Sequence, residues 1–148
     1  MYKTILVPLD GSERAEAILR HVEDLAKSWG AKVIFLQVVE PIPVAVGPDG
    51  LNPALDQAAF AEQLSMAESY LTRVEREFRE KGINAKRRVA CGTVVGQVLN
   101  VAKEEGVDLI AMASHGRSAL SRVFYGSVAA GVLHSVDRPL LLIRSVGH

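Results

Sequence analysis

Short apolar runs alternate with segments of helical periodicity along the whole chain. The runs contain many branched side chains and end in turn-forming residues, a pattern typical of strands buried in a sheet. The third run differs from the others, because residues 86–88 are Lys-Arg-Arg. The pattern predicts five strands, at residues 4–9, 33–39, 84–91, 107–112 and 139–144.

The segments between these strands repeat their apolar positions every three to four residues, the spacing of an amphipathic helix. The first begins near Glu13 and ends at Gly30, since glycine often ends a helix. The second lies between Pro53 and Gly82, after a loop from Pro41 that contains four prolines and two glycines. Its apolar stripe also permits a coiled coil, although about three heptads equally suit a helix that lies on a sheet. The last two expected helices are Thr93–Glu105 and about Gly126–Ser135.

This alternation predicts an α/β fold: an open, mainly parallel five-stranded sheet with helices on both faces, in a single domain over residues 1–148. Strands 4–9, 33–39 and 107–112 are strongly apolar, apart from Asp108 in the last, as expected of interior strands, whereas the charged strand 84–91 suits an edge. The composition therefore favours the Rossmann-like strand order 3-2-1-4-5. The flavodoxin-like order 2-1-3-4-5 would bury the charged strand centrally.

The favoured order also predicts where a ligand binds. In that order the chain leaves strands one and four in opposite directions, and ligands of open α/β sheets bind outside the carboxyl ends of the strands at such a switch point. The loops that follow these two strands begin at Asp10 and Ala113. We therefore expect a binding site between the two loops.

Composition argues against several classes of partner. Lys and Arg total 17, as do Asp and Glu, so the net charge is zero and there is no general attraction to nucleic acid or to an anionic membrane. No apolar run approaches the ~20 residues of a membrane helix, and the first residues lack a secretory signal pattern. Cys91 is the only cysteine, so an intrachain disulfide is impossible. We expect a cytoplasmic protein in which Cys91 fills a small buried space.

The segment 113–129, after the fourth strand, contains the candidate chemistry. Gly116 permits a tight turn with a bare backbone, and Gly126 with Ser127 opens the last helix. A helix N-terminus presents free N–H groups and the positive end of the helix dipole, which together bind anions. Asp10, across the crevice, can accept hydrogen bonds from a ribose. These residues compose a nucleotide site that needs no catalytic group.

Several enzyme classes lack their motif in this chain. It has no Gly-x-x-x-x-Gly-Lys-Ser/Thr run of a P-loop NTPase and no Gly-x-Gly-x-x-Gly after the first strand. A response-regulator receiver needs a phosphoacceptor Asp after the third strand, where this chain has Cys91 and Gly92. The histidines lack the spacing of zinc ligands, and no Gly-x-Ser-x-Gly is present. No catalytic residue is therefore predicted; Arg117 and Arg122 either steer phosphate or are simply solvated.

The same segment resembles the signature of the universal stress protein family, which is Gly, two residues, Gly, nine residues, then Gly followed by Ser or Thr. This chain matches it at Gly116, Gly126 and Ser127, with Ala113 in place of the first glycine. Its opening and closing segments, from Ile5 to Glu13 and from Arg138 to Ile143, resemble the first strand and turn and the last strand of the family. The resemblance covers essentially the whole chain and implies an adenine nucleotide alpha hydrolase-like fold.

The resemblance implies a ligand and a site. The ligand is ATP, or AMP or another adenine nucleotide, with Mg²⁺ or Mn²⁺ held through the phosphates. In ATP-binding members the counterpart of Asp10 meets the ribose or adenine, a backbone near Val38 reads the base, and the glycine loop and Gly-Ser turn hold the phosphates. Ala113 would be strained if the loop needs a positive φ there, and Gln37 stands where many members have histidine. The implied site residues are Pro8, Leu9, Asp10, Val38, Ala113, Ser114, His115, Gly116, Arg117, Gly126, Ser127 and Val128.

The resemblance also implies a homodimer, joined through the strand Pro139–Arg144. That strand is apolar and lies at a predicted sheet edge, which invites aggregation unless another strand covers it. Three functions stay open. The first is an ATP-binding, dimeric regulatory module of the stress response with little or no hydrolysis. The others are a dimeric interaction module with incidental nucleotide binding, and a slow ATPase.

Overall fold

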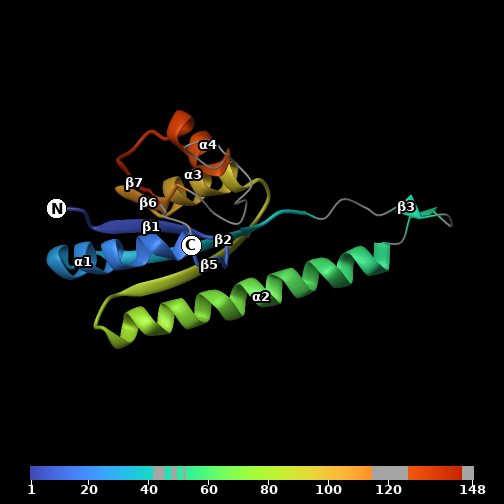
Figure 1. The fold of residues 1–148 in the computed structure, drawn as a ribbon, viewed down its shortest axis with the longest axis horizontal. Coiled ribbons are helices and arrows are strands. Elements are labelled where there is room, and N and C mark those ends of the chain that lie inside the picture. The colour runs from blue at the N-terminus through green and yellow to red at the C-terminus, as the bar shows by residue number, and fades with distance from the viewer. Residues whose placement is uncertain (42–45, 48–49, 52, 115–126, 145–148) are drawn as a thin grey trace.

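The computed structural model describes residues 1–41, 46–47, 50–51, 53–114 and 127–144. Its main strands are β1 (Thr4–Leu9), β2 (Lys32–Val39), β5 (Ala85–Cys91), β6 (Leu109–Ala113) and β7 (Leu140–Ile143). They form one parallel sheet in the order β5-β2-β1-β6-β7 (Figure 1). This confirms the predicted order 3-2-1-4-5, with the charged strand at an edge.

Helices cover both faces of the sheet, as predicted. They are the 3-10 helix η1 (Ala15–Ile18), which leads into α1 (Leu19–Trp29), then α2 (Pro53–Glu80), α3 (Val94–Glu104) and α4 (Ser127–Ser135). The helices α1 and α2 pack on one face, and α3 and α4 pack on the other (Figure 1). No helix in the described ranges is both long enough and apolar enough to span a bilayer.

The interior strands supply side chains to both core layers. In β2, Val33 and Phe35 pack in the layer with α1 and α2, whereas Ile34 and Leu36 pack in the layer with α3 and α4. The Phe35 ring meets Phe78 of α2 edge to face, with centroids 4.8 Å apart. Because both faces are buried, these strands are apolar at consecutive positions, as from Val33 to Leu36, rather than only at alternate ones.

The amino edge of the sheet is anchored by one carboxylate. Asp108, immediately before β6, accepts hydrogen bonds from the backbone N–H groups of Lys3 and Thr4 at 2.8 and 2.9 Å. These bonds hold the start of β1 beside the start of β6, where Ile5 is the register partner of Leu109. The two strands therefore reach the opposite edge of the sheet together.

All three cationic side chains of the edge strand β5 form ion pairs, one on one face of the strand and two on the other. These pairs follow the alternation of the strand, since Arg87 turns toward α2 and its two neighbours turn toward the end of α3. Charges along an edge discourage another chain from extending the sheet there. The pairs join Arg87 to Glu68 and Glu75, Lys86 to Glu105, and Arg88 to Glu104 and Glu105.

The predicted apolar stripe of α2 divides into two parts. Its C-terminal members are buried in the core layer shared with α1, so α2 lies on the sheet as a crossover helix. Phe60 and Leu64 are only half-buried, because the first half of α2 extends past the carboxyl edge of the sheet (Figure 1). The buried members are Ala67, Leu71, Val74 and Phe78.

Two details differ from the expectations. Cys91 is exposed rather than a buried filler, because it is the last residue of the edge strand β5. The segment from Pro41 to Pro53, predicted only as a loop, contains two short strands, β3 (Val46–Gly47) and β4 (Gly50–Leu51), which pair antiparallel.

We expect Arg87→Ala to lower the free energy of unfolding by more than Glu68→Ala does, because it removes a partner from a buried carboxylate. The side chain of Glu75 is 8% exposed and is held by Arg87 at 3.1 Å and by Arg79 at 3.3 Å. Glu68 is 53% exposed, so Glu68→Ala should cost only about 0.5 kcal/mol. Urea unfolding measures both variants, and equal losses would contradict this assignment.

Candidate functional site

Three strands end side by side at the carboxyl edge of the sheet, where the chain leaves β1 and β6 in opposite directions. Leu9 is the register partner of Gln37, and Leu6 is that of Ile110. Continuing these registers by one and four residues places Asp10 between Val38 of β2 and Ser114 after β6. The loops that begin at Asp10 and at Ala113 are therefore neighbours, as the strand order predicted.

The turn after β1 fixes the carboxylate of Asp10. Its Oδ1 accepts hydrogen bonds from the backbone N–H of Ser12 at 3.0 Å and from the Ser12 hydroxyl at 2.6 Å. The Ser12 Oγ in turn accepts from the N–H of Ala15 at 3.2 Å, at the start of η1. Gly11 between them has φ +85°, which glycine adopts without strain. The sequence Asp-Gly-Ser therefore fixes both the orientation of the Asp10 carboxylate and the start of the 3-10 helix η1.

The residues next to Asp10 face different layers. Val38 is half-buried against the core layer of α3 and α4. Leu9 is 5% exposed and packs in the opposite layer, so its side chain belongs to the core. Pro8 is half-buried beside its register partner Leu36. Val38 and Pro8 therefore project to the α3 and α4 side of the sheet, because Leu6 and Leu36, which share the face of Pro8, pack in that layer.

The alanine that replaces the first glycine of the motif is unstrained. Ala113 is the last residue of β6, is 7% exposed, and pairs in register with Ile143. No non-glycine residue in the described ranges has a positive φ, so the methyl group of Ala113 meets no backbone penalty. Ser114 follows it, 4% exposed, and its N–H donates to the carbonyl of Ile143 at 2.8 Å.

The helix α4 begins at Ser127, the motif serine. Because β6 and β7 are parallel, the helix between them runs back across the sheet, and its N-terminus lies at the carboxyl edge. Val128 packs against the core layer shared with α3, and a Cβ on Gly131 would come within 2.7 Å of the Val95 side chain of α3. This close approach fixes the position of α4. The predicted residues His115, Gly116, Arg117 and Gly126 lie outside the described residues, as does Arg122.

The fold brings one side chain to this edge that the sequence did not indicate. Tyr70 of α2 is half-buried, and its hydroxyl has no hydrogen-bond partner among the described residues. Burial raises the pKa of Tyr70 far above its usual value, and the nearby carboxylates of Glu16 and Asp10 raise it further. Tyr70 therefore packs on the α1 and α2 side of the sheet, within electrostatic reach of these two carboxylates. In the sequence it is one polar position beside an apolar stripe, so only the fold reveals it.

A second buried atom on the same side lacks a partner. Gln37 is the residue of β2 beside Leu9, and its Oε1 is buried without a hydrogen bond in the described part of the chain. Gln37 alternates with Val38 along the strand, so the two side chains project to opposite faces of the sheet. The Gln37 side chain therefore lies on the face of the sheet that α1 and α2 cover, opposite the face to which Val38 projects.

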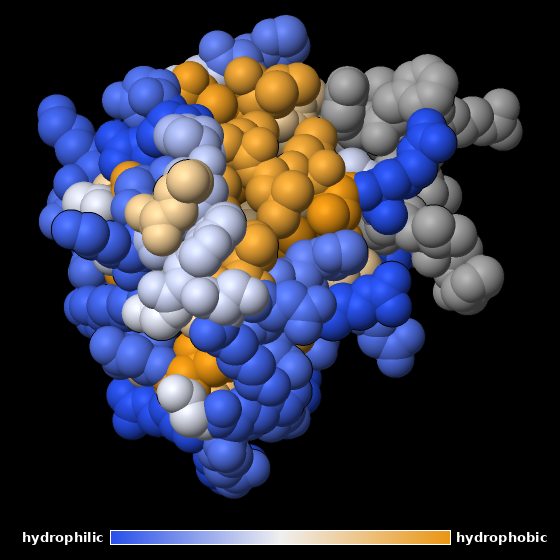
Figure 2. Space-filling model, turned by 90° about the vertical axis from the view of Figure 1, so that its left-hand side faces the viewer, coloured by the Kyte–Doolittle hydropathy of each residue, from blue (hydrophilic) through white to orange (hydrophobic). Residues whose placement is uncertain are grey.

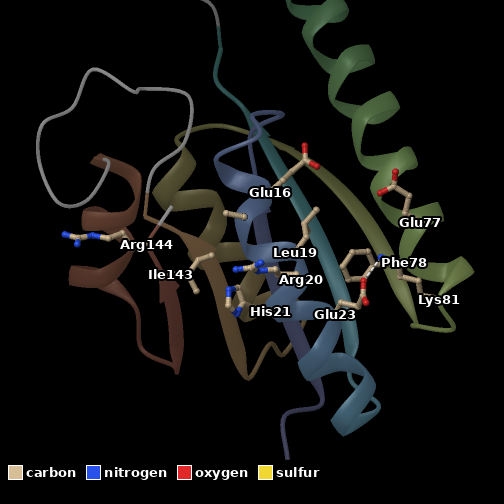
Figure 3. A pocket seen from close by; sticks show the side chains of 11 residues that line it. Glu16, Leu19, Arg20, His21, Glu23, Glu77, Phe78, Lys81, Ile143 and Arg144 are labelled. Carbon is tan, nitrogen blue, oxygen red and sulfur yellow. Dashed lines mark hydrogen bonds and ion pairs between the residues drawn. The ribbon is translucent and has the colours of Figure 1, made fainter. Parts of the chain in front are cut away.

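Two further observations concern metal binding and the position of a surface depression. No group of three or more His, Cys, Asp or Glu side chains within the described ranges could hold a metal ion. A surface depression of about 840 Å³ lies along α1 (Figure 3) and includes none of the predicted site residues. The predicted site and this depression are therefore separate features.

Known proteins resemble the chain over its whole length. The model of the universal stress protein family matches residues 1–144. The universal stress protein MJ0577 of Methanocaldococcus jannaschii is 29% identical, over 97% of this chain and 96% of its own. The solved structure of MJ0577 matches with a TM-score of 0.89 at 28% identity, covering 100% of this chain and 99% of that one.

More distant solved structures share the fold. A universal stress protein in complex with cAMP has a TM-score of 0.67 at 20% identity and covers 97% of this chain and 98% of its own. A universal stress protein of Archaeoglobus fulgidus in complex with dAMP has a TM-score of 0.68 at 19% identity, covering 96% and 98%.

We expect Tyr70→Phe to leave stability at pH 7 unchanged or to raise it by up to about 1 kcal/mol, because the lost hydroxyl makes no hydrogen bond to the part of the chain that the structure describes. The raised pKa of Tyr70 means that the folded protein keeps the phenol protonated after the unfolded chain has ionised it. Its contribution is complete below a pH of about 10 and is lost as the pH rises above that value. The variant should therefore lose less stability than the wild type between about pH 10 and 12 in urea unfolding. Identical alkaline losses in the two proteins would refute the assignment.

Proposed function

Because this chain belongs to the universal stress protein family, we propose that it binds an adenine nucleotide, ATP in the first instance, at the carboxyl edge of its sheet. The observation that supports this most directly is the pairing of β1 with β2 and with β6, whose registers, when continued, place Val38, Asp10 and Ser114 at one edge. The N-terminus of α4 lies at the same edge. A carboxylate and a helix N-terminus at one edge suit the two ends of a nucleotide, a ribose and a phosphate chain.

The carboxylate end of the row suits the nucleoside. Asp10 is held by two hydrogen bonds within its own turn, so its orientation is set before a ligand arrives. We assign the ribose hydroxyl groups to Asp10 and the base to the backbone around Val38. A fixed acceptor binds more tightly than a mobile one, because no side-chain freedom is lost on binding.

The other end of the site suits the phosphates. The first N–H groups of α4 have no partner inside the helix and lie at the positive end of its dipole. We assign the phosphates to these groups, to the Ser127 hydroxyl and to the backbone at Gly116 and Gly126. Mg²⁺ or Mn²⁺ would then bind through the phosphate oxygens rather than through a protein cluster.

The fold itself is compatible with such ligands. The structures in complex with cAMP and with dAMP share it, and both of those ligands are adenine nucleotides. Because these two proteins are only 20% and 19% identical to this chain, they support the capacity of the fold to hold an adenine nucleotide. They do not indicate which residues of this chain contact it. The choice of ATP for this chain rests on the family signature at Gly116, Gly126 and Ser127.

We assign a regulatory role rather than an enzymatic one. Rapid hydrolysis needs a group that orients water and a cation that neutralises the γ-phosphate, and the motif segment supplies no P-loop lysine. Bound nucleotide would stabilise the folded chain by mass action. The module would act in the cytoplasm, where ATP is abundant.

A dimer joined through β7 accompanies this proposal. β7 forms an edge of the sheet, and all four of its apolar residues are only half-buried. Figure 2 shows an apolar area in its upper half, on the side where Figure 1 places α4 and β7. Leu133 of α4 adds an apolar side chain that is 42% exposed. Pairing with the same strand of a second copy would cover this edge.

We expect ATP to bind with a dissociation constant below millimolar, measured by isothermal titration, and to raise the melting temperature. Asp10→Asn keeps an acceptor for the Ser12 hydrogen bonds but removes the charge, so it should weaken binding about tenfold while the fold persists. Glu13→Gln, on the exposed side of the same turn, is the matched control and should bind like the wild type. If ATP, AMP and GTP all fail to bind below millimolar, the proposed function is wrong.

We expect light scattering to give twice the 16.0 kDa chain mass at micromolar concentration. The carbonyls of Pro139 and Ile143 accept bonds from the β6 side, so the N–H groups of Leu140 and Leu142 face outward. Leu142→Pro removes an outward N–H without breaking the ladder to β6 and should give a folded monomer. A persistent monomer for the wild type, or an unchanged dimer for the folded variant, would contradict the β7 interface.

A further inference from the structure

The N-terminal half of α2 projects past the carboxyl edge of the sheet and is not used by the proposed nucleotide site (Figure 1). We call residues 57–66 the projecting half of α2. All of its residues are exposed except Phe60 and Leu64, which are half-buried. Neither of these two belongs to a core layer formed by the described residues. The projecting half therefore has an apolar side that the described core does not cover.

Phe60 and Leu64 lie on the face of α2 that packs on the sheet further along the helix. They precede Ala67 and Leu71 at spacings of four, three and four residues, so the four side chains form one stripe. Ala67 and Leu71 are 1% and 0% exposed, whereas the half of α2 that bears Phe60 and Leu64 extends past the end of the sheet (Figure 1). The projecting half thus continues a core-facing stripe beyond the core.

The chain around this stripe has a strong excess of negative charge. Residues 40–72 contain five acidic residues and no Lys, Arg or His. Because the net charge of the whole chain is zero, the rest of the chain carries an equal excess of positive charge. Glu68, four residues after Leu64 and so its neighbour on the helix surface, is 53% exposed although it pairs with Arg87. The acidic residues are Glu40, Asp49, Asp56, Glu62 and Glu68.

These charges narrow the range of binding partners. Nucleic acid and anionic lipid both present phosphates, which a negative segment repels. The same segment of a second copy carries the same charges, so a coiled coil between two projecting halves would place like charges together. The partner that fits is a surface with apolar side chains at its centre and cations at its margins.

We propose that the projecting half of α2 binds a basic amphipathic helix of a partner protein. The apolar side of that helix would pack against Phe60 and Leu64, in the way that the side-chain ridges of two helices interlock. Its Lys and Arg side chains would lie in the negative field of residues 40–72, which also speeds the encounter of the two proteins. The projecting half is about 15 Å long at the rise of an α-helix, so a few turns of the partner helix cover it.

The surface includes no residue of the proposed nucleotide site and no residue of β7, the strand assigned to the dimer. It can therefore bind its partner whether or not the chain binds a nucleotide, and it is tested without nucleotide.

The test uses the full chain and a fluorescein-labelled peptide of lysine and leucine, with the leucines spaced to form one face of a helix. Fluorescence anisotropy should show that the wild-type protein binds this peptide. A peptide of the same composition, in an order without that spacing, should bind at least tenfold more weakly, because it cannot present an apolar face. Binding of the amphipathic peptide should weaken as salt is raised, because salt screens the attraction between exposed charges.

Leu64→Gln and Phe60→Gln each remove apolar surface from the stripe and introduce a good helix former, so each should weaken binding about fivefold. Met66→Gln is the matched control. Met66 is 61% exposed and stands two residues from Leu64, on the other side of the helix, so this variant should bind like the wild type. All three variants should keep the wild-type melting temperature within a few degrees, because none of them changes a residue of the core layers.

Light scattering on the same samples tests whether a second copy of the chain occupies the stripe instead. The proposal predicts the same mass for the wild type and for Leu64→Gln. It is overturned if the wild type does not bind the amphipathic peptide, or if the rearranged peptide binds equally well. Equal weakening by Met66→Gln and Leu64→Gln, or a lower mass for Leu64→Gln, would also overturn it.

Discussion

The burial of β1 between two parallel neighbours determines most of this structure. β1 pairs with β2 on one side and β6 on the other, and its interior residues are covered on both faces. The carboxylate of Asp108 holds its start beside β6. With the start and the register set, three strands must end together, so that Val38, Asp10 and Ser114 share one edge. The nucleotide site that we propose at this edge therefore depends on strand pairing as well as on the motif.

The alternation of side chains along the strands then separates two layers of the molecule. Val38 faces the layer of α3 and α4, while its neighbour Gln37 faces the layer of α1 and α2. The proposed phosphate contacts use the start of α4, and α1 lies on the opposite face of the sheet. The turn Asp10-Gly11-Ser12 belongs to both regions, because its hydrogen bonds connect the end of β1 to the start of η1.

The sequence predicted what depends on patterns of polarity, and missed what depends on tertiary environment. A strand with Lys86, Arg87 and Arg88 is suited only to an edge, so the strand order was predictable and is confirmed. The exposure of Cys91 and the proximity of Tyr70 to Asp10 were not, because both depend on what a neighbouring element covers. The strain at Ala113 was left open by the sequence and is resolved by the strand geometry of β6.

A crystal structure of the protein with ATP and magnesium tests the central claim most directly. The account predicts a ribose hydroxyl within hydrogen-bond distance of the Asp10 carboxylate and phosphate oxygens against the backbone N–H groups of Gly116 and Ser127. A nucleotide bound elsewhere would contradict it. So would a crevice filled by side chains, with the first N–H groups of α4 directed away from Asp10.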